Sequence, residues 1–230
     1  MEVNSRVKKR SNRMMKSWVW TAALSGLLML GVAKAETIYE NDFQSVELGE
    51  EPDEFLVLDG QFVAQEEGTE RFLVLPGAPL DNFGALFGPS RREGMRIRVR
   101  IMGQSKRRLA PAFGVGLHGL GGFKLMVSAN KRKLELLRGD ELVSSIDYRW
   151  QIKDWTQIVF EARPKGESGW LVRGKIWSAA EPEPTNWTIQ ASADTAPPRG
   201  KASIWGHPFS GYPIRYDDIV VESVPPVSRD

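Results

Sequence analysis

The stretch Met95-Arg96-Ile97-Arg98-Val99-Arg100-Ile101-Met102 decides the fold. Its apolar residues and its arginines alternate strictly. In an extended strand every apolar side chain then points to one side and every arginine to the other. A helix would scatter both kinds of residue around its axis. The stretch is therefore predicted to be a β-strand with one face on a core and with Arg96, Arg98 and Arg100 on the opposite face.

The same two-residue period extends over most of the chain, and turn residues interrupt it every eight to twelve positions or so. Further strands are predicted at 37–43, 61–64, 71–75, 112–117, 123–128, 133–137, 142–148, 156–163, 170–178, 187–191, 201–205 and 216–222. Gly139 and Gly166 are suited to the hairpin turns between two pairs of these strands. So many strands predict an all-β protein, an antiparallel two-sheet β-sandwich of the jelly-roll type.

The first 35 residues have the pattern of an export signal. Six basic residues precede an apolar run at 18–32, and Ala33-Lys34-Ala35 follows with small residues where a signal peptidase cuts. We expect a signal peptide at 1–35, cleaved before Glu36, and a periplasmic or secreted protein. The run of fifteen residues is shorter than the roughly 20 that span a bilayer, so no stable membrane anchor is expected. Translation can start at Met1, Met14 or Met15.

The rest of the chain is predicted to be a single domain at 36–224 with a short C-terminal tail at 225–230. Removing the leader leaves 24 basic and 28 acidic side chains, a net charge of −4. This acidic balance argues against nucleic acid as a partner. The chain has no cysteine, which excludes disulfides, thiolate metal ligands, a cysteine nucleophile and a lipidated cysteine.

Several short motifs resemble those of concanavalin A-like lectin/glucanase jelly rolls, including laminin G-like modules. They are Tyr39-Glu40-Asn41-Asp42-Phe43, Gly122-Phe123-Lys124-Leu125, Lys133-Leu134-Glu135-Leu136-Leu137-Arg138, Trp155-Thr156, Phe160-Glu161-Ala162, Gly200-Lys201-Ala202-Ser203-Ile204-Trp205-Gly206 and Tyr216-Asp217-Asp218-Ile219-Val220-Val221. The resemblance covers nearly the whole chain after the leader. It implies a concanavalin A-like fold, and it leaves the function open because lectins, hydrolases, lyases and inert modules share that fold.

The same resemblance implies that the first and last strands run side by side. In jelly rolls of this kind, acidic side chains at that place hold a structural Ca²⁺, which takes six to eight oxygen ligands. Here the implied ligands are Asp42 and Asp217, with Glu40 or Asp218.

The familiar catalytic motifs are absent from the sequence. There is no Glu-x-Asp-x-Glu strand of the family's glycosidases, no HExxH zinc motif and no GxSxG elbow. His118 and His207 lie in connections rich in glycine or proline, and we expect both to be loop residues. A non-catalytic role is favoured. A glycoside hydrolase or polysaccharide lyase of the same fold is an alternative, because distant side chains can converge, and an envelope structural or protein-interaction module is another.

The strand at 170–178 carries the candidate glycan contacts. Alternation buries Trp170, Val172 and Ile176, and it places Arg173, Lys175 and Trp177 on the other face. An exposed indole can stack on a sugar ring, and neighbouring cations suit acidic polysaccharide.

We therefore predict that Trp177, Arg173 and Lys175 bind a glycan together with the arginine row Arg96, Arg98 and Arg100. In the other interpretation, that row is a solvated face paired with nearby carboxylates. The composite site requires that all six side chains lie on one sheet face.

Overall fold

The computed structural model describes Met1 and residues 34–77, 82–105, 109–151, 154–208 and 211–227. The chain divides into two units, Met1–Val32 and Ala33–Asp230, and the fold below is that of the second unit. Most of the predicted signal peptide lies outside the described residues, as does half of the predicted tail. The predicted domain boundaries at residues 35 and 224 stay predictions. No helix among the described residues is long and apolar enough to cross a membrane.

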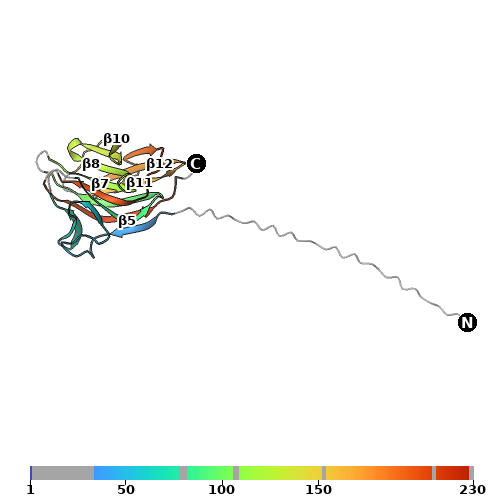
Figure 1. Cartoon of the computed structure of the whole chain (residues 1–230), viewed down its shortest axis with the longest axis horizontal. Coiled ribbons are helices and arrows are strands. Elements are labelled where there is room, and N and C mark those ends of the chain that lie inside the picture. The colour runs from blue at the N-terminus through green and yellow to red at the C-terminus, as the bar shows by residue number, and fades with distance from the viewer. Residues whose placement is uncertain (2–33, 78–81, 106–108, 152–153, 209–210, 228–230) are drawn as a thin grey trace. The chain divides into compact units, whose positions relative to one another are not determined.

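The described residues form fifteen strands and one 3₁₀ helix (Figure 1). The strands are β1 (Glu36–Asn41), β2 (Leu56–Asp59), β3 (Val63–Glu67), β4 (Glu70–Leu75), β5 (Phe83–Arg91), β6 (Met95–Met102), β7 (Ala112–Leu117), β8 (Phe123–Ser128), β9 (Lys133–Arg138), β10 (Glu141–Asp147), β11 (Thr156–Lys165), β12 (Gly169–Ser178), β13 (Ile189–Ala193), β14 (Gly200–His207) and β15 (Ile214–Ser223). The helix is η1 (Ala129–Lys131).

These strands form two antiparallel sheets. The first sheet has the order β13-β12-β11-β6-β15-β4-β3, and β1 also pairs with β15. The second has the order β10-β9-β8-β7-β14-β5-β2. The predicted all-β, two-sheet jelly roll is confirmed.

The core lies between the two sheets, and β6 shows why. Met95, Ile97, Val99 and Ile101 have no exposed surface, whereas the arginines between them are only partly buried. Phe87, Phe113 and Phe123 of the second sheet are also fully buried and belong to the same core. Burial of apolar surface at roughly 25 cal/mol per Å² is the main force that holds the sheets together.

The predicted turns are confirmed. Gly139 has φ of 56° and Gly166 has φ of 71°, values that glycine adopts without the steric cost of a Cβ atom. Gly139 connects β9 to β10, and Gly166 connects β11 to β12.

Two strands were not predicted, β2 and β5. In β5, Gly84, Gly88 and Pro89 interrupt the alternation that identifies a strand. The structure requires glycine at position 84, because a Cβ atom there would lie 2.7 Å from the indole ring of Trp205. The strand predicted at 187–191 is β13, which begins at Ile189.

The first and last strands run side by side, as the resemblance implies, with Glu36 opposite Ser223 and Asn41 opposite Ile219. The first part of β15 pairs with β4 and the later part with β1. β15 has a bulge between Asp217 and Val220, where its neighbour changes from β4 to β1. Asp218 lies in this bulge and has φ of 50°.

His118 is a buried histidine at the end of β7. Its side chain has no exposed surface, and Nε2 lies 3.0 Å from the carbonyl oxygen of Glu93. The ring meets that of Trp170 edge-on at 5.2 Å. Within the described residues, Nδ1 has no hydrogen-bond partner. Since Nε2–H donates to the carbonyl, a second proton on Nδ1 would be buried without an acceptor.

Acidification from pH 7 to 5 is therefore expected to lower the free energy of unfolding. Burial lowers the pKa of His118 in the folded protein, against an opposing effect of Glu93. The unfolded chain, with a histidine pKa of about 6.5, then takes up a proton that the folded protein does not, so stability falls as pH falls.

Urea unfolding at both pH values tests this. His118→Asn is the comparison, because asparagine tolerates the φ of 66° at this position. It also separates His118 from His207, whose pKa is lowered too. The variant should lose less stability than the wild type between the two pH values. Equal losses would show that His118 is not responsible.

Candidate functional site

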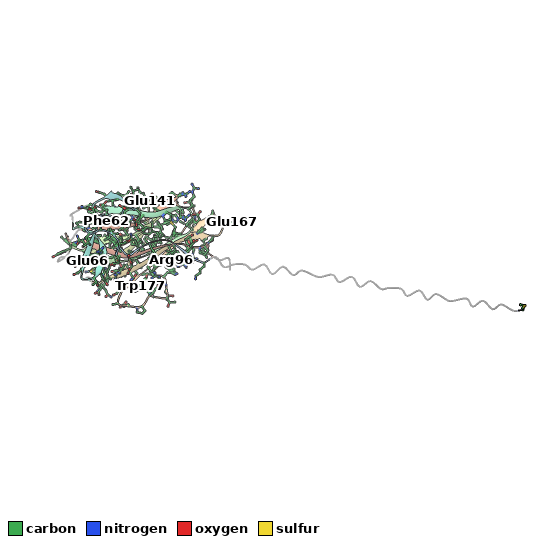
Figure 2. All side chains as sticks on the ribbon, turned by 90° about the horizontal axis from the view of Figure 1, so that it is seen from below. Phe62, Glu66, Arg96, Glu141, Glu167 and Trp177 are labelled. Carbon is green, nitrogen blue, oxygen red and sulfur yellow. The ribbon has the colours of Figure 1, made fainter. Side chains whose placement is uncertain are left out.

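The strand register brings the six predicted glycan-binding residues onto the outer face of the first sheet. Across β6, β11 and β12 the rows are Arg96-Glu161-Arg173, Arg98-Val159-Lys175 and Arg100-Gln157-Trp177. In Figure 2, Arg96 and Trp177 lie on the side of the domain opposite Glu141 of β10. The geometric requirement of the composite site is met.

The cations of this face already have carboxylate partners. Glu161, whose side chain is fully buried, forms ion pairs with Arg96, Arg163 and Arg173. The distance from Oε1 is 2.8 Å both to Arg163 Nε and to Arg173 Nη2. The structure therefore agrees with the other interpretation of the arginine row, a partly solvated face of paired charges.

The remaining predicted cations are paired in the same way. Glu183 lies 3.0 Å from both Arg98 Nη2 and Lys175 Nζ. Arg100 Nη2 lies 2.6 Å from Asp217 Oδ2, and Arg100 Nε lies 3.0 Å from Asp218 Oδ2. An acidic glycan would have to compete with these carboxylates.

Trp177 was predicted to be exposed, and this is wrong, because only 8% of its surface is accessible. The guanidinium of Arg98 lies 5.9 Å from its ring centroid. The arginines also cover two neighbouring indoles, with Arg100 at 4.6 Å from Trp155 and Arg173 at 4.2 Å from Trp187. Each of these indoles therefore has a cation near its ring.

Two of the predicted calcium ligands lie beside an arginine. Asp217 and Asp218 both pair with Arg100, and Asp42 accepts a hydrogen bond from the backbone N–H of Gln44. Burial raises the pKa of Asp217 despite the opposing effect of Arg100. In the described part of the chain, no three such side chains converge to hold a metal ion. The calcium hypothesis has no support from this geometry.

A cleft of about 820 Å³ runs along this face beside β1 and contains several of the predicted residues. Its lining includes Trp177 and Arg98 together with Glu40, Asp42, Glu54, Glu181, Glu183 and Asp218. Six carboxylates and one arginine make it unfavourable for an acidic polysaccharide, contrary to the prediction from the arginine row.

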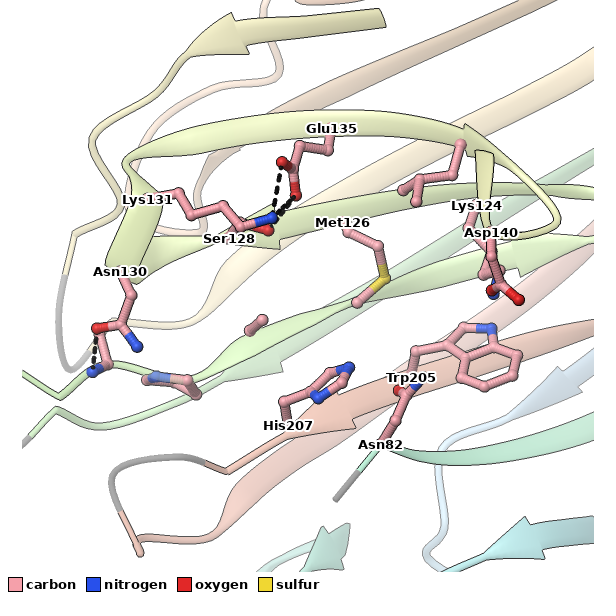
Figure 3. A pocket seen from close by; sticks show the side chains of 14 residues that line it. Asn82, Lys124, Met126, Ser128, Asn130, Lys131, Glu135, Asp140, Trp205 and His207 are labelled. Atoms are coloured by element: carbon pink, nitrogen blue, oxygen red, sulfur yellow. Dashed lines mark hydrogen bonds and ion pairs between the residues drawn. The ribbon is translucent and has the colours of Figure 1, made fainter. Parts of the chain in front are cut away.

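A second pocket, of about 240 Å³, lies on the outer face of the second sheet (Figure 3). Four strands line it, with Ala112 of β7, Lys124, Met126 and Ser128 of β8, Glu135 and Leu137 of β9, and Trp205 and His207 of β14; the segments outside these strands add Asn82, Ala110, Pro111, Asn130, Lys131 and Asp140. In Figure 3, Met126, Trp205 and His207 surround its centre, with Lys124 and Asp140 toward one end and Asn130 toward the other. The floor is therefore apolar and the rim polar.

Glycines in β7 and β5 leave room for two side chains of the pocket lining, Met126 and Trp205. Gly114 lies between Met126 and Trp205 in the sheet, and a Cβ atom on it would lie 2.0 Å from the carbonyl oxygen of Leu125. Gly84 lies on the other side of Trp205 and leaves room for the indole against the sheet. The indole Nε1–H donates to Ser203 Oγ at 2.9 Å, which fixes the orientation of the ring.

The polar side chains of the rim form two groups. At one end, Lys124 Nζ lies 4.5 Å from the ring centroid of Trp205 and donates to Asp140 Oδ1 at 3.0 Å. Along the β8–β9 side, Ser128 donates to Glu135, and Lys131 Nζ lies 3.2 Å from Glu135 Oε1.

His207 lies beside Trp205 on the pocket lining. Burial lowers its pKa, and the positive charges of Lys124 and Lys131 lower it further. Its imidazole is therefore mostly neutral at pH 7. Contrary to the expectation of a loop, His207 is the last residue of β14.

The chain matches no protein-family model and no curated protein in sequence. Solved structures with the same fold include the carbohydrate-binding module CBM66 from Bacillus subtilis, at 13% identity and TM-score 0.53, covering 74% of this chain and 96% of that one. The CBM2 module of the evolved Dit of Lactobacillus casei BL23 phage J-1 matches at 9% identity and TM-score 0.54, covering 85% and 99%. A single-residue mutant of the Emp46p carbohydrate recognition domain matches at 10% identity and TM-score 0.54, covering 82% of this chain and 98% of that one.

Identities this low establish the fold alone. It is the two-sheet jelly roll of carbohydrate-binding modules and galectin-like proteins, consistent with the concanavalin A-like fold that the sequence motifs suggested.

Proposed function

We propose that this protein is exported by its leader and binds carbohydrate, without catalysis, in the pocket lined by Met126, Trp205 and His207 on the outer face of the second sheet. The observation that carries the proposal is the pocket itself, where Trp205 and Met126 form part of the lining together with polar side chains. Apolar ring faces pack on aromatic and thioether groups, and sugar hydroxyls need hydrogen-bonding partners at the rim.

The size of the pocket supports one sugar ring. Its volume of about 240 Å³ is below the roughly 300–1,000 Å³ of sites that enclose drug-sized ligands. The carbohydrate-binding modules among the structures of the same fold agree with this proposal.

A glycan array with the purified protein tests the proposal, using Trp205→Leu and Trp177→Leu as a matched pair. Both tryptophans are at least nine-tenths buried and lie on opposite sheets, so the two substitutions perturb packing similarly. We expect Trp205→Leu to lose at least about tenfold in affinity, as central aromatic contacts do, and Trp177→Leu to bind like the wild type.

If Trp177→Leu lost affinity and Trp205→Leu did not, the site would lie on the first sheet, where it was predicted from the sequence. Arrays in calcium and in chelator should be identical. A folded protein that binds no glycan in either condition would contradict the proposed function.

A second candidate function, a polysaccharide lyase, is favoured by one observation. The mostly neutral imidazole of His207 lies in the same pocket as Lys124. A lyase needs a base next to a cation that neutralises the carboxylate of a uronate. Unsaturated product, detected by its ultraviolet absorbance and lost in His207→Ala, would favour the enzyme.

A further inference from the structure

Lys124 and its partner Asp140 differ sharply in burial. The side chain of Lys124 is 9% exposed, whereas that of Asp140 is 96% exposed. A buried ammonium is expensive to leave without a counter-charge. A fully solvated carboxylate at a turn contributes little to such a pair, because water screens it and its rotamers are costly to fix.

The ammonium also has unused capacity to donate. In the described part of the chain, its contacts are Asp140 Oδ1 and the ring of Trp205. A lysine carries three N–H donors, and the pocket lies next to it. The position of Asp140, directly after Gly139 in the β9–β10 turn, lets its side chain turn away into water.

Two lysines and two carboxylates line the pocket, and Lys131 is paired with Glu135. The charges of Lys124 and Lys131 disfavour the protonated imidazole of His207, in addition to the effect of burial. Because Lys131 is already paired with Glu135, Lys124 is the cation that would stabilise a ligand carboxylate, through a charge-assisted hydrogen bond.

We propose that the pocket selects a sugar bearing a carboxylate, a uronate, and that this carboxylate replaces Asp140 on Lys124. The inference rests on the proposed carbohydrate-binding function. The sugar ring lies on Trp205 and Met126, and its carboxylate points to the Lys124 end of the pocket. Without ligand, Asp140 pairs with the ammonium of Lys124.

Calorimetric titration tests this with oligomers of glucuronate, galacturonate, mannuronate and guluronate, each beside its neutral hexose counterpart. We expect at least one uronate oligomer to bind about tenfold tighter than its counterpart, and the difference to shrink as salt is raised. Lys124→Met should remove the preference for the uronate oligomer over its neutral counterpart. Asp140→Asn should tighten uronate binding about two- to fivefold, since it removes a competing exposed carboxylate.

Asp147→Asn is the matched control. Asp147 is also an exposed carboxylate, at 92%, and it pairs with Lys133 at 2.9 Å on the same sheet. It does not line the pocket, so its substitution should leave uronate affinity unchanged.

The outcomes separate the two proposals. Binding of neutral sugar that depends on Trp205, with no preference for uronate, overturns the inference and leaves the proposed function intact. Weaker uronate binding by Asp140→Asn also overturns the inference, because Asp140 would then be a ligand contact. A folded protein that binds neither class of sugar contradicts both.

Discussion

Replacing Glu161 with alanine is expected to lower the free energy of unfolding by about 3–5 kcal/mol, the cost of breaking a buried ion pair from one side. Glu161 is fully buried and is the shared partner of Arg96, Arg163 and Arg173. Without it, three guanidinium groups repel one another on the first sheet. Of these three, and within the described ranges, only Arg96 would keep a carboxylate, Glu222 at 3.3 Å.

Thermal and urea denaturation measure this change. A loss of that size lowers Tm by roughly 10 °C in a domain of about 190 residues. Glu183→Ala is the control, because Glu183 also pairs with two cations but is 38% exposed. It should cost at most about 1 kcal/mol. Equal losses of stability for the two variants would show that the ion pairs of Glu161 are as well solvated as those of Glu183.

The second large effect is expected from Gly114→Ala, which should destabilise the protein by about 3 kcal/mol and abolish binding in the pocket. The added Cβ atom would lie 2.0 Å from the carbonyl oxygen of Leu125 and 2.7 Å from Met126 Sδ. The sulfur can move, but the carbonyl belongs to the neighbouring strand β8, so β7 and β8 would have to separate.

Gly121→Ala is the matched control. There the nearest atom to an added Cβ is Pro198 Cγ at 3.4 Å, an ordinary contact, and stability should change by less than about 0.5 kcal/mol. Chemical denaturation and glycan titration of both variants measure the two effects. If Gly114→Ala were as stable as Gly121→Ala and still bound glycan, close packing at Gly114 would not be what positions Met126 in the pocket.

Much of the fold could be predicted because it is recorded in local alternation. The period of β6 is determined by eight consecutive residues, and its buried face in the structure is the one expected. The strand β5 could not be identified in this way. Gly84 is there to accommodate Trp205, which lies far along the sequence in β14, so the reason for the break is not local.

The candidate site was harder to predict for a related reason. The rows of β6, β11 and β12 were correctly placed on one face, but alternation does not show what covers a face. Trp177 alternates with buried residues and is itself buried. The pocket depends on the pairing of β7 with β14, and no pattern within either strand predicts that they are neighbours.

The positions of β14 and β15 in the two sheets also determine when the fold can be completed. β14 lies between β7 and β5, and β15 lies between β6 and β4. Until a ribosome has made residues 200–223, each sheet therefore consists of two separate halves with unpaired edges. Such long-range pairing is slow and leaves intermediates prone to aggregation. Closure of the first sheet therefore requires β15, and closure of the second requires β14.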